Sequence, residues 1–73
     1  MLYVTTTEHG LQVLLDDAGI AVLENVLTRL RAQGHIHIGT PSCGHNELDE
    51  VSPYGDKTTI HDISLDYEPD YTA

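Results

Sequence analysis

The chain is poor in several residue types that usually define the chemistry of a small protein. It has one cysteine, three basic residues and no tryptophan or phenylalanine among its 73 residues. One cysteine excludes an internal disulfide, and the lack of a basic, apolar leader predicts a cytoplasmic protein. No apolar stretch approaches the ~20 residues of a membrane span, so we expect no membrane contact. The core must therefore be built mainly from Leu, Ile and Val.

Acidic residues dominate the charge of the chain. Twelve acidic residues against three basic ones give a formal net charge of -9. This balance argues against a nucleic-acid partner, which requires Lys and Arg to neutralise phosphates. It fits a basic protein partner, because complementary charge raises association rates and specificity, and it fits equally well a role in keeping the protein in solution.

The first third of the chain predicts a β-hairpin. Two β-prone runs, residues 2–6 and 11–15, flank a turn that contains Gly10. Alternation in the second run places Leu11, Val13 and Leu15 on one face.

The next segment predicts one amphipathic helix of roughly four turns. Asp16 or Asp17 is suited to cap its N-terminus, and Gly34 is suited to end it in a left-handed conformation. The expected apolar stripe comprises Ile20, Leu23, Val26, Leu27 and Leu30.

Two further β-prone segments follow the helix. Residues 35–38 alternate, so that the isoleucines are expected to point inward and the histidines outward. A long polar loop, residues 39–57, leads to a last strand within residues 58–67, and an acidic, mobile tail is expected over residues 68–73. Because Ile60 and Ile63 differ in parity, we predict a β-bulge near His61 and Asp62.

These elements predict a single α+β domain over residues 1–73. The order ββαββ favours a small two-layer sandwich, in which one amphipathic helix covers one face of a mostly antiparallel sheet.

The middle of the chain offers a candidate metal site. His35 and His37 share one face of a strand, and Cys43 and His45 follow closely. Four such side chains are the ligands that tetrahedral zinc prefers, although their spacing matches no standard zinc pattern. A metal-binding or regulatory domain is therefore the alternative hypothesis, and the main expectation is that the protein holds no metal or other cofactor.

Enzymatic chemistry has weaker support. A nucleophilic Cys43 would need a base and an oxyanion hole, and a chain this short has little volume for a substrate pocket. The carboxylates of Glu47, Asp49 and Glu50 lie in a loop, where acids seldom acquire the separated pKa values of an acid–base pair. We expect no catalytic residues, with a small hydrolase as the remaining alternative.

Residues 35–50 also carry a distinctive pattern. It reads His35-x-His37-Ile38-x-Thr40-Pro41-Ser42-x-Gly44-x-Asn46-Glu47-Leu48-x-Glu50. This pattern resembles that of the bacterial immunity proteins of immunity protein family 32, in which a similar strand enters a Thr-Pro-Ser turn and a last apolar strand follows a variable loop. Where many relatives carry an aromatic residue after this turn, the chain has Cys43.

The resemblance implies an antitoxin without enzymatic activity. Such proteins bind a cognate toxin from a contact-dependent inhibition or type VI secretion system, and the toxin can be a nuclease, a deaminase or an ADP-ribosyltransferase. An acidic inhibitor suits the basic surface of a toxin that acts on nucleic acid. The expected apolar anchors are Leu48, Tyr54 and Tyr67. The expected polar contacts are His35, His37, Asn46, Glu47, Asp49 and Glu50.

Overall fold

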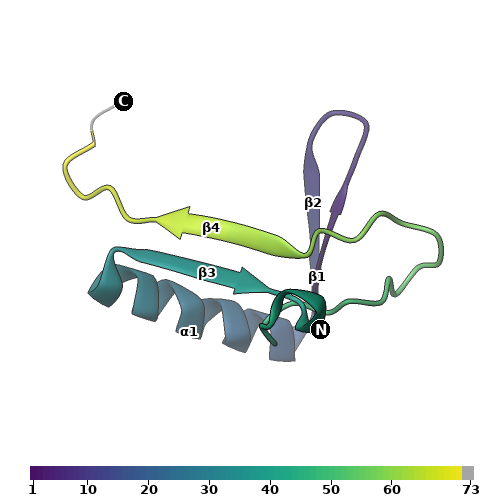
Figure 1. The fold of residues 1–73 in the computed structure, drawn as a ribbon, viewed down its shortest axis with the longest axis horizontal. Coiled ribbons are helices and arrows are strands. Elements are labelled where there is room, and N and C mark those ends of the chain that lie inside the picture. Colours follow the sequence, from purple (N-terminus) through teal and green to yellow (C-terminus); the bar gives the residue numbers. More distant parts are fainter. Residues whose placement is uncertain (72–73) are drawn as a thin grey trace.

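The computed structural model describes residues 1–71 and confirms the predicted α+β domain with the order ββαββ (Figure 1). Its elements are β1 (Leu2–Thr6), β2 (Leu11–Leu15), α1 (Asp17–Gln33), β3 (His35–Gly39), the short 3-10 helix η1 (Pro41–Cys43) and β4 (Asp62–Asp66). The tail is exposed as far as Tyr71, and the last two residues of the predicted tail lie outside the described part.

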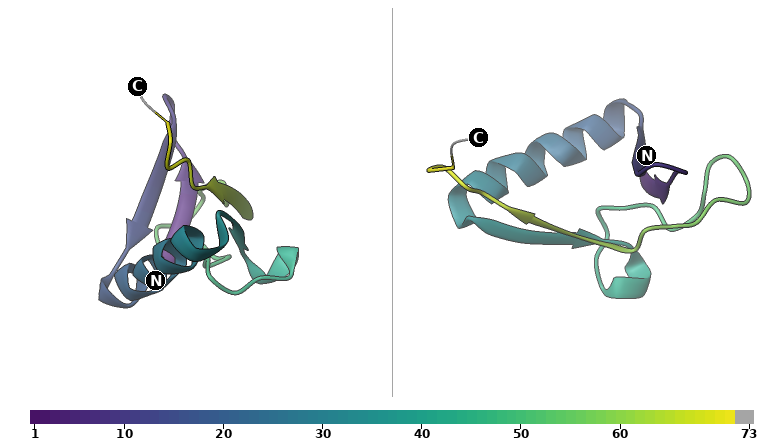
Figure 2. Two further views of the ribbon diagram at one scale, coloured as in Figure 1. Left: turned by 90° about the vertical axis from the view of Figure 1, so that its left-hand side faces the viewer. Right: turned by 90° about the horizontal axis from the view of Figure 1, so that it is seen from above.

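The strands form two antiparallel pairs. β1 pairs with β2, and β3 pairs with β4, so the expected sheet is divided into two two-stranded sheets. Figures 1 and 2 show the β1–β2 hairpin crossing β3 and β4 steeply, with α1 running beside β3. The helix contacts strands of both sheets, and it thereby joins them into one domain.

The segment before β4 corrects the predicted bulge. Thr59 forms a β-bridge with Thr5, and the N–H of Ile60 donates to the carbonyl of Val4 at 2.9 Å. The chain then leaves β1, and the strand paired with β3 begins at Asp62. Ile60 and Ile63 differ in parity because they belong to segments that pair with different strands, and no bulge is needed.

Both ends of α1 confirm the predicted caps. The carboxylate of Asp16 accepts a hydrogen bond from the N–H of Gly19 at 2.9 Å. Gly34 has a φ of 81°, and its N–H donates to the carbonyl of Leu30 at 2.7 Å. Local side-chain chemistry therefore sets both helix boundaries.

The buried stripe of α1 is rotated from the predicted one. Val26 is fully buried, and Val22 packs against the core beside it. Ile20 and Leu27 remain 43% and 51% exposed. Gly19 is buried at the helix start, where a Cβ would lie 1.8 Å from the carbonyl oxygen of Met1, so the helix directly approaches the backbone of the residue that precedes β1.

Burial in the first hairpin is uneven between its two strands. Leu11 and Val13 of β2 are 64% and 46% exposed, and Leu15 packs against the core. Residues 2–5 of β1 are buried on both faces. The hydroxyl of Tyr3 lies 2.9 Å from that of Thr59, so the segment before β4 covers the side of β1 that is turned away from the core. β2 consequently lies at the edge of the domain.

The core consists of aliphatic side chains from every layer. Its buried members are Leu2, Val4, Val26, Ile36, Ile38 and Leu48. An apolar cleft of about 240 Å³ remains between the two hairpins and the helix. Its lining is Leu2, Val4, Val13, Leu23, Ile38, Leu48, Ile63 and Leu65. All eight lining side chains are aliphatic, and the one fully buried aromatic residue among the described residues, Tyr3, is not among them.

Candidate functional site

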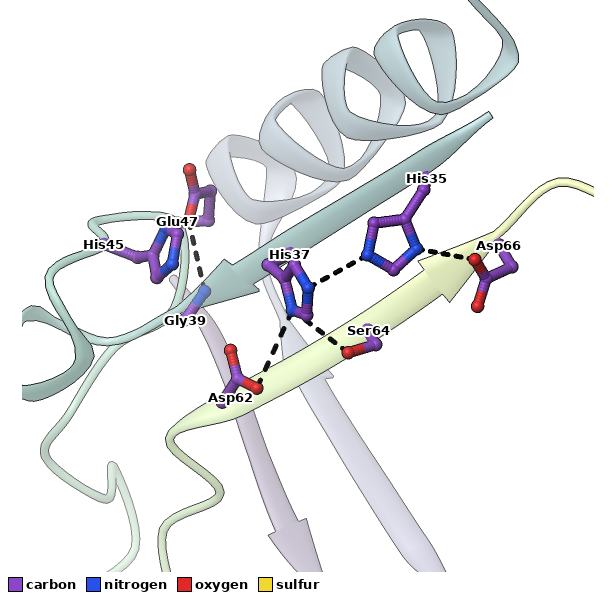
Figure 3. Close-up of polar contacts among 8 residues, drawn as sticks. All are labelled: His35, His37, Gly39, His45, Glu47, Asp62, Ser64 and Asp66. Atoms are coloured by element: carbon purple, nitrogen blue, oxygen red, sulfur yellow. Dashed lines mark hydrogen bonds and ion pairs between the residues drawn. The ribbon is translucent and has the colours of Figure 1, made fainter. Parts of the chain in front are cut away.

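The outer face of β3 carries a histidine cluster, formed by His35, His37, Asp62, Ser64 and Asp66 (Figure 3). Nδ1 of His35 lies 2.5 Å from a carboxylate oxygen of Asp66. The Nε2 atoms of His35 and His37 lie 2.9 Å apart. Nδ1 of His37 lies 3.0 Å from the hydroxyl of Ser64 and 3.9 Å from a carboxylate oxygen of Asp62.

Strand geometry explains why this cluster forms. The isoleucines of β3 are buried and its histidines are exposed, as the alternation predicted. The antiparallel register places His35 opposite Asp66 and His37 opposite Ser64. Side chains at opposite positions of paired strands are close enough to interact, so the sheet itself assembles the cluster. Both imidazoles remain about half exposed to solvent.

The structure does not assemble the four-residue metal site considered above. Cys43 is exposed in η1, and Nδ1 of His45 lies 3.7 Å from a carboxylate oxygen of Glu47 instead of joining the cluster on β3. Within residues 1–71, no group of three or more His, Cys, Asp or Glu side chains has an arrangement that could hold a metal ion. Only His35 and His37 of the predicted set come together.

The acidic residues of the loop fasten its first part to the domain. A carboxylate oxygen of Asp49 accepts a hydrogen bond from the N–H of Leu2 at 2.8 Å. Glu47 accepts one from the N–H of Gly39 at 3.2 Å. Side chains expected to be free for a partner are therefore already engaged with the backbone, and they hold residues 39–50 in one conformation.

Glu50 makes a similar contact. The hydroxyl of Ser42 and its N–H, which donates to a carboxylate oxygen of Glu50 at 2.8 Å, hold the pKa of this carboxyl below its ordinary value of 4.5. The carbonyl of Glu50 also accepts a hydrogen bond from the hydroxyl of Thr59 at 3.0 Å. Glu50 thus joins η1 to the segment that precedes β4.

Leu48 was wrongly predicted as a contact residue. Its side chain is only 2% exposed and belongs to the core. Its N–H donates to the carbonyl of Gly39 at 3.0 Å, which turns the loop inward. Asn46 is exposed and lines a shallow surface groove together with Glu47 and Arg29 of α1.

The tip of the loop, residues 51–56, projects away from the helix and sheets (Figures 1 and 2). Tyr54 is 70% exposed there, and Tyr67 is 41% exposed after β4; their role as anchors stays a prediction. Val51 is 81% exposed beside Glu50, and the sequence analysis did not name it as a contact residue. The signal that could have identified it was an apolar residue between the polar residues Glu50 and Ser52.

Comparison with known proteins adds no relative to this description. No protein-family model, curated protein or solved structure matches the chain. The resemblance to immunity proteins therefore rests on the pattern of residues 35–50. No helix within residues 1–71 combines the length and the apolar character needed to cross a membrane.

Proposed function

We propose that this protein is a non-enzymatic immunity protein that binds a cognate toxin domain and covers its active site. The observation that carries the proposal is the form of the loop over residues 39–57. Its first part is fastened to the domain by carboxylates, and its tip presents Val51 and Tyr54 with 81% and 70% of their surfaces uncovered.

An ordered loop favours tight binding. A loop that is already held in its bound conformation loses less conformational entropy when a partner docks. The bonds that Glu47, Asp49 and Glu50 make to backbone N–H groups supply this order. The same acids thus support recognition by positioning the tip, in place of the direct contacts expected from the sequence.

Charge and side-chain chemistry indicate the partner. Tyrosine buried at the centre of an interface commonly contributes a large share of the binding free energy, and surrounding charges add specificity. Asp56 follows two residues after Tyr54 in the tip, within a protein of net charge -9. This combination suits a basic toxin surface, and a nuclease fits better than a deaminase or an ADP-ribosyltransferase because its substrate-binding surface is commonly basic.

Co-expression with the toxin encoded beside this protein tests the proposal. We expect rescue of growth and a complex at micromolar concentration. Tyr54→Ala should weaken the complex by about 2 kcal/mol, roughly 30-fold. Tyr71→Ala is the matched control, because Tyr71 is 76% exposed but lies outside the loop. Absence of both rescue and complex would refute the proposal, and equal effects of the two substitutions would refute the role of the tip.

A further inference from the structure

One side of the domain leaves its aliphatic core open to solvent. The apolar cleft of about 240 Å³ is lined by Val13 of β2, by Leu23 of α1 and by six further aliphatic side chains. Val13 is nearly half exposed although it belongs to this lining. A domain of this size buries too little apolar surface to leave some uncovered without a loss of stability. A second chain that covered the cleft would therefore stabilise the domain.

Exposed apolar side chains extend the surface of this cleft. Leu11 lies on the same face of β2 as Val13, in the part of the hairpin that projects beyond β4 (Figure 1). Ile20 and Leu27 are exposed on α1, and helix geometry places both within about 60° of Leu23 around the helix axis. Together these five residues form one apolar surface, here named the open face. An apolar surface of this extent on a small protein commonly marks an interface.

The charges beside the open face are arranged so that the face complements its own copy. α1 carries Asp17 in its first turn and Arg31 in its last turn. These residues lie about 21 Å apart along the helix and within about 40° of each other around its axis, on the side of Leu27. Where two copies of α1 meet antiparallel about a two-fold axis, each Asp17 lies beside Arg31 of the other copy. A two-fold interface uses one patch twice, so it requires this self-complementarity.

We propose that the open face is the interface of a two-fold symmetric homodimer, in which the α1 helices pack antiparallel and each copy covers the cleft of the other. A stable interface buries about 800 Å² on each partner, roughly one sixth of the 5085 Å² that this chain exposes. A basic toxin fits the open face less well, because its five side chains carry no charge. The loop tip with Val51 and Tyr54 lies outside this face, so the dimer is independent of toxin binding.

Analytical ultracentrifugation of the full chain tests the dimer. Over roughly 1–200 μM protein, we expect the mass to rise from the 8.0 kDa of one chain towards twice that value. Leu27→Glu should raise the dissociation constant at least about tenfold, because it buries a charge in an apolar interface, and Leu11→Glu should do the same from the hairpin. Val51→Glu is the matched control, because it makes the same change at an exposed apolar residue of the loop tip. Circular dichroism and thermal unfolding establish that each variant is folded.

An exchange of charges tests the antiparallel arrangement. Asp17→Arg and Arg31→Asp should each weaken the dimer severalfold, and the double variant should restore it. Two groups about 21 Å apart in one chain are too distant to pair, so restoration reports a contact between copies. Glu24 lies midway between them and would face its counterpart near the two-fold axis, so Glu24→Gln should tighten the dimer. A double variant that associates no better than the single variants would overturn the antiparallel arrangement.

The response to salt distinguishes the dimer from the proposed toxin complex. Salt should strengthen the dimer, because it screens the repulsion between two chains of net charge -9, and it should weaken binding to a basic toxin. A mass that stays at 8.0 kDa throughout would overturn the dimer, as would unchanged association of folded Leu11→Glu and Leu27→Glu variants. A monomeric chain whose Leu27→Glu variant loses affinity for the toxin would also overturn it, and would assign the open face to the toxin.

Discussion

Leu2 and Asp49 exchange two hydrogen bonds across 47 positions of the sequence. The N–H of Leu2 donates to the Asp49 carboxylate at 2.8 Å, and the N–H of Asp49 donates to the carbonyl of Leu2 at 2.7 Å. Through this reciprocal pair, the long loop is fastened to the first strand of the domain.

Asp49→Ala should therefore lower the free energy of unfolding. Loss of one part-buried hydrogen bond to a charged group costs about 1.5–3 kcal/mol. Urea denaturation measures the change. Asp56→Ala in the loop tip is the control, and we expect it to alter the unfolding midpoint little. Equal midpoints for both variants would show that the Leu2–Asp49 pair does not stabilise the domain.

Replacement of Gly19 should reverse the usual effect of alanine in a helix. Gly→Ala within an exposed helix commonly stabilises by about 1 kcal/mol. A Cβ at Gly19 would meet the Met1 carbonyl oxygen at 1.8 Å, so Gly19→Ala should instead destabilise the domain by about 1–3 kcal/mol as helix and strand separate. Thermal unfolding of Gly19→Ala and of Gly10→Ala, where a Cβ meets nothing within 4 Å, provides the comparison. A stabilised Gly19→Ala variant would contradict this close contact.

Leu48→Ala should destabilise the domain much more than a substitution at a nearby exposed residue of the loop. Leu48 is 2% exposed, and truncation of a buried leucine costs about 2–5 kcal/mol. Val51→Ala, three residues later at a site 81% exposed, should change stability by less than about 0.5 kcal/mol. Chemical denaturation of the two variants measures the difference. A small effect at Leu48 would place its side chain outside the core.

The contribution of Glu50 to stability should depend on pH. The folded protein lowers the pKa of this carboxyl, so the unfolded chain takes up the proton first, and the stabilisation is present above the ordinary value of 4.5. It is lost as the pH falls through the folded pKa. Glu50→Gln should therefore lower the thermal midpoint at neutral pH, and the difference from the unaltered protein should vanish in acid. Glu8→Gln, in the exposed hairpin turn, is the control. A difference that stays constant with pH would refute this account.

Asp16 should behave in the same direction at the start of α1. The ammonium group of Met1 and the N–H of Gly19 hold the pKa of its carboxyl below the ordinary value of 3.8. Asp16→Asn keeps a side-chain acceptor for the helix N-terminus but removes the charge. The thermal midpoint of Asp16→Asn should lie below that of the unaltered protein at neutral pH, and this difference should disappear as the pH falls through the folded pKa of Asp16. A difference that persists in acid would assign the effect to the geometry of the cap instead of its charge.

Features set by neighbouring residues could be predicted from the sequence. The helix begins after Asp16 and ends at Gly34 because each cap acts on backbone within one turn. The outward histidines of β3 follow from alternation alone. These predictions required no knowledge of which elements pack together.

Features set by distant residues could not be predicted in this way. The apolar stripe of α1 is wide enough that several rotations are reasonable, and packing against β1 decides that Val22 is covered and Leu27 is not. The acids of the loop looked free because Asp49 finds its donor 47 positions away. The contacts of His35 with Asp66 and of His37 with Ser64 likewise depend on the register with β4.

Because the chain changes pairing partner at His61, β1 and β3 each receive one of their neighbours from residues 58–66, late in synthesis. Thr5 receives its contact with Thr58 from 53 positions further along the chain, and such distant contacts form slowly because a large loop must close first. On the ribosome, the first hairpin and α1 emerge well before residues 58–66. Until these residues follow, the edge of β3 that pairs with β4 has no partner, and Tyr3 and Thr5 lack the contacts that Thr58 and Thr59 give them. An unpaired strand edge can pair with other chains, so this stage of synthesis is the one most exposed to aggregation.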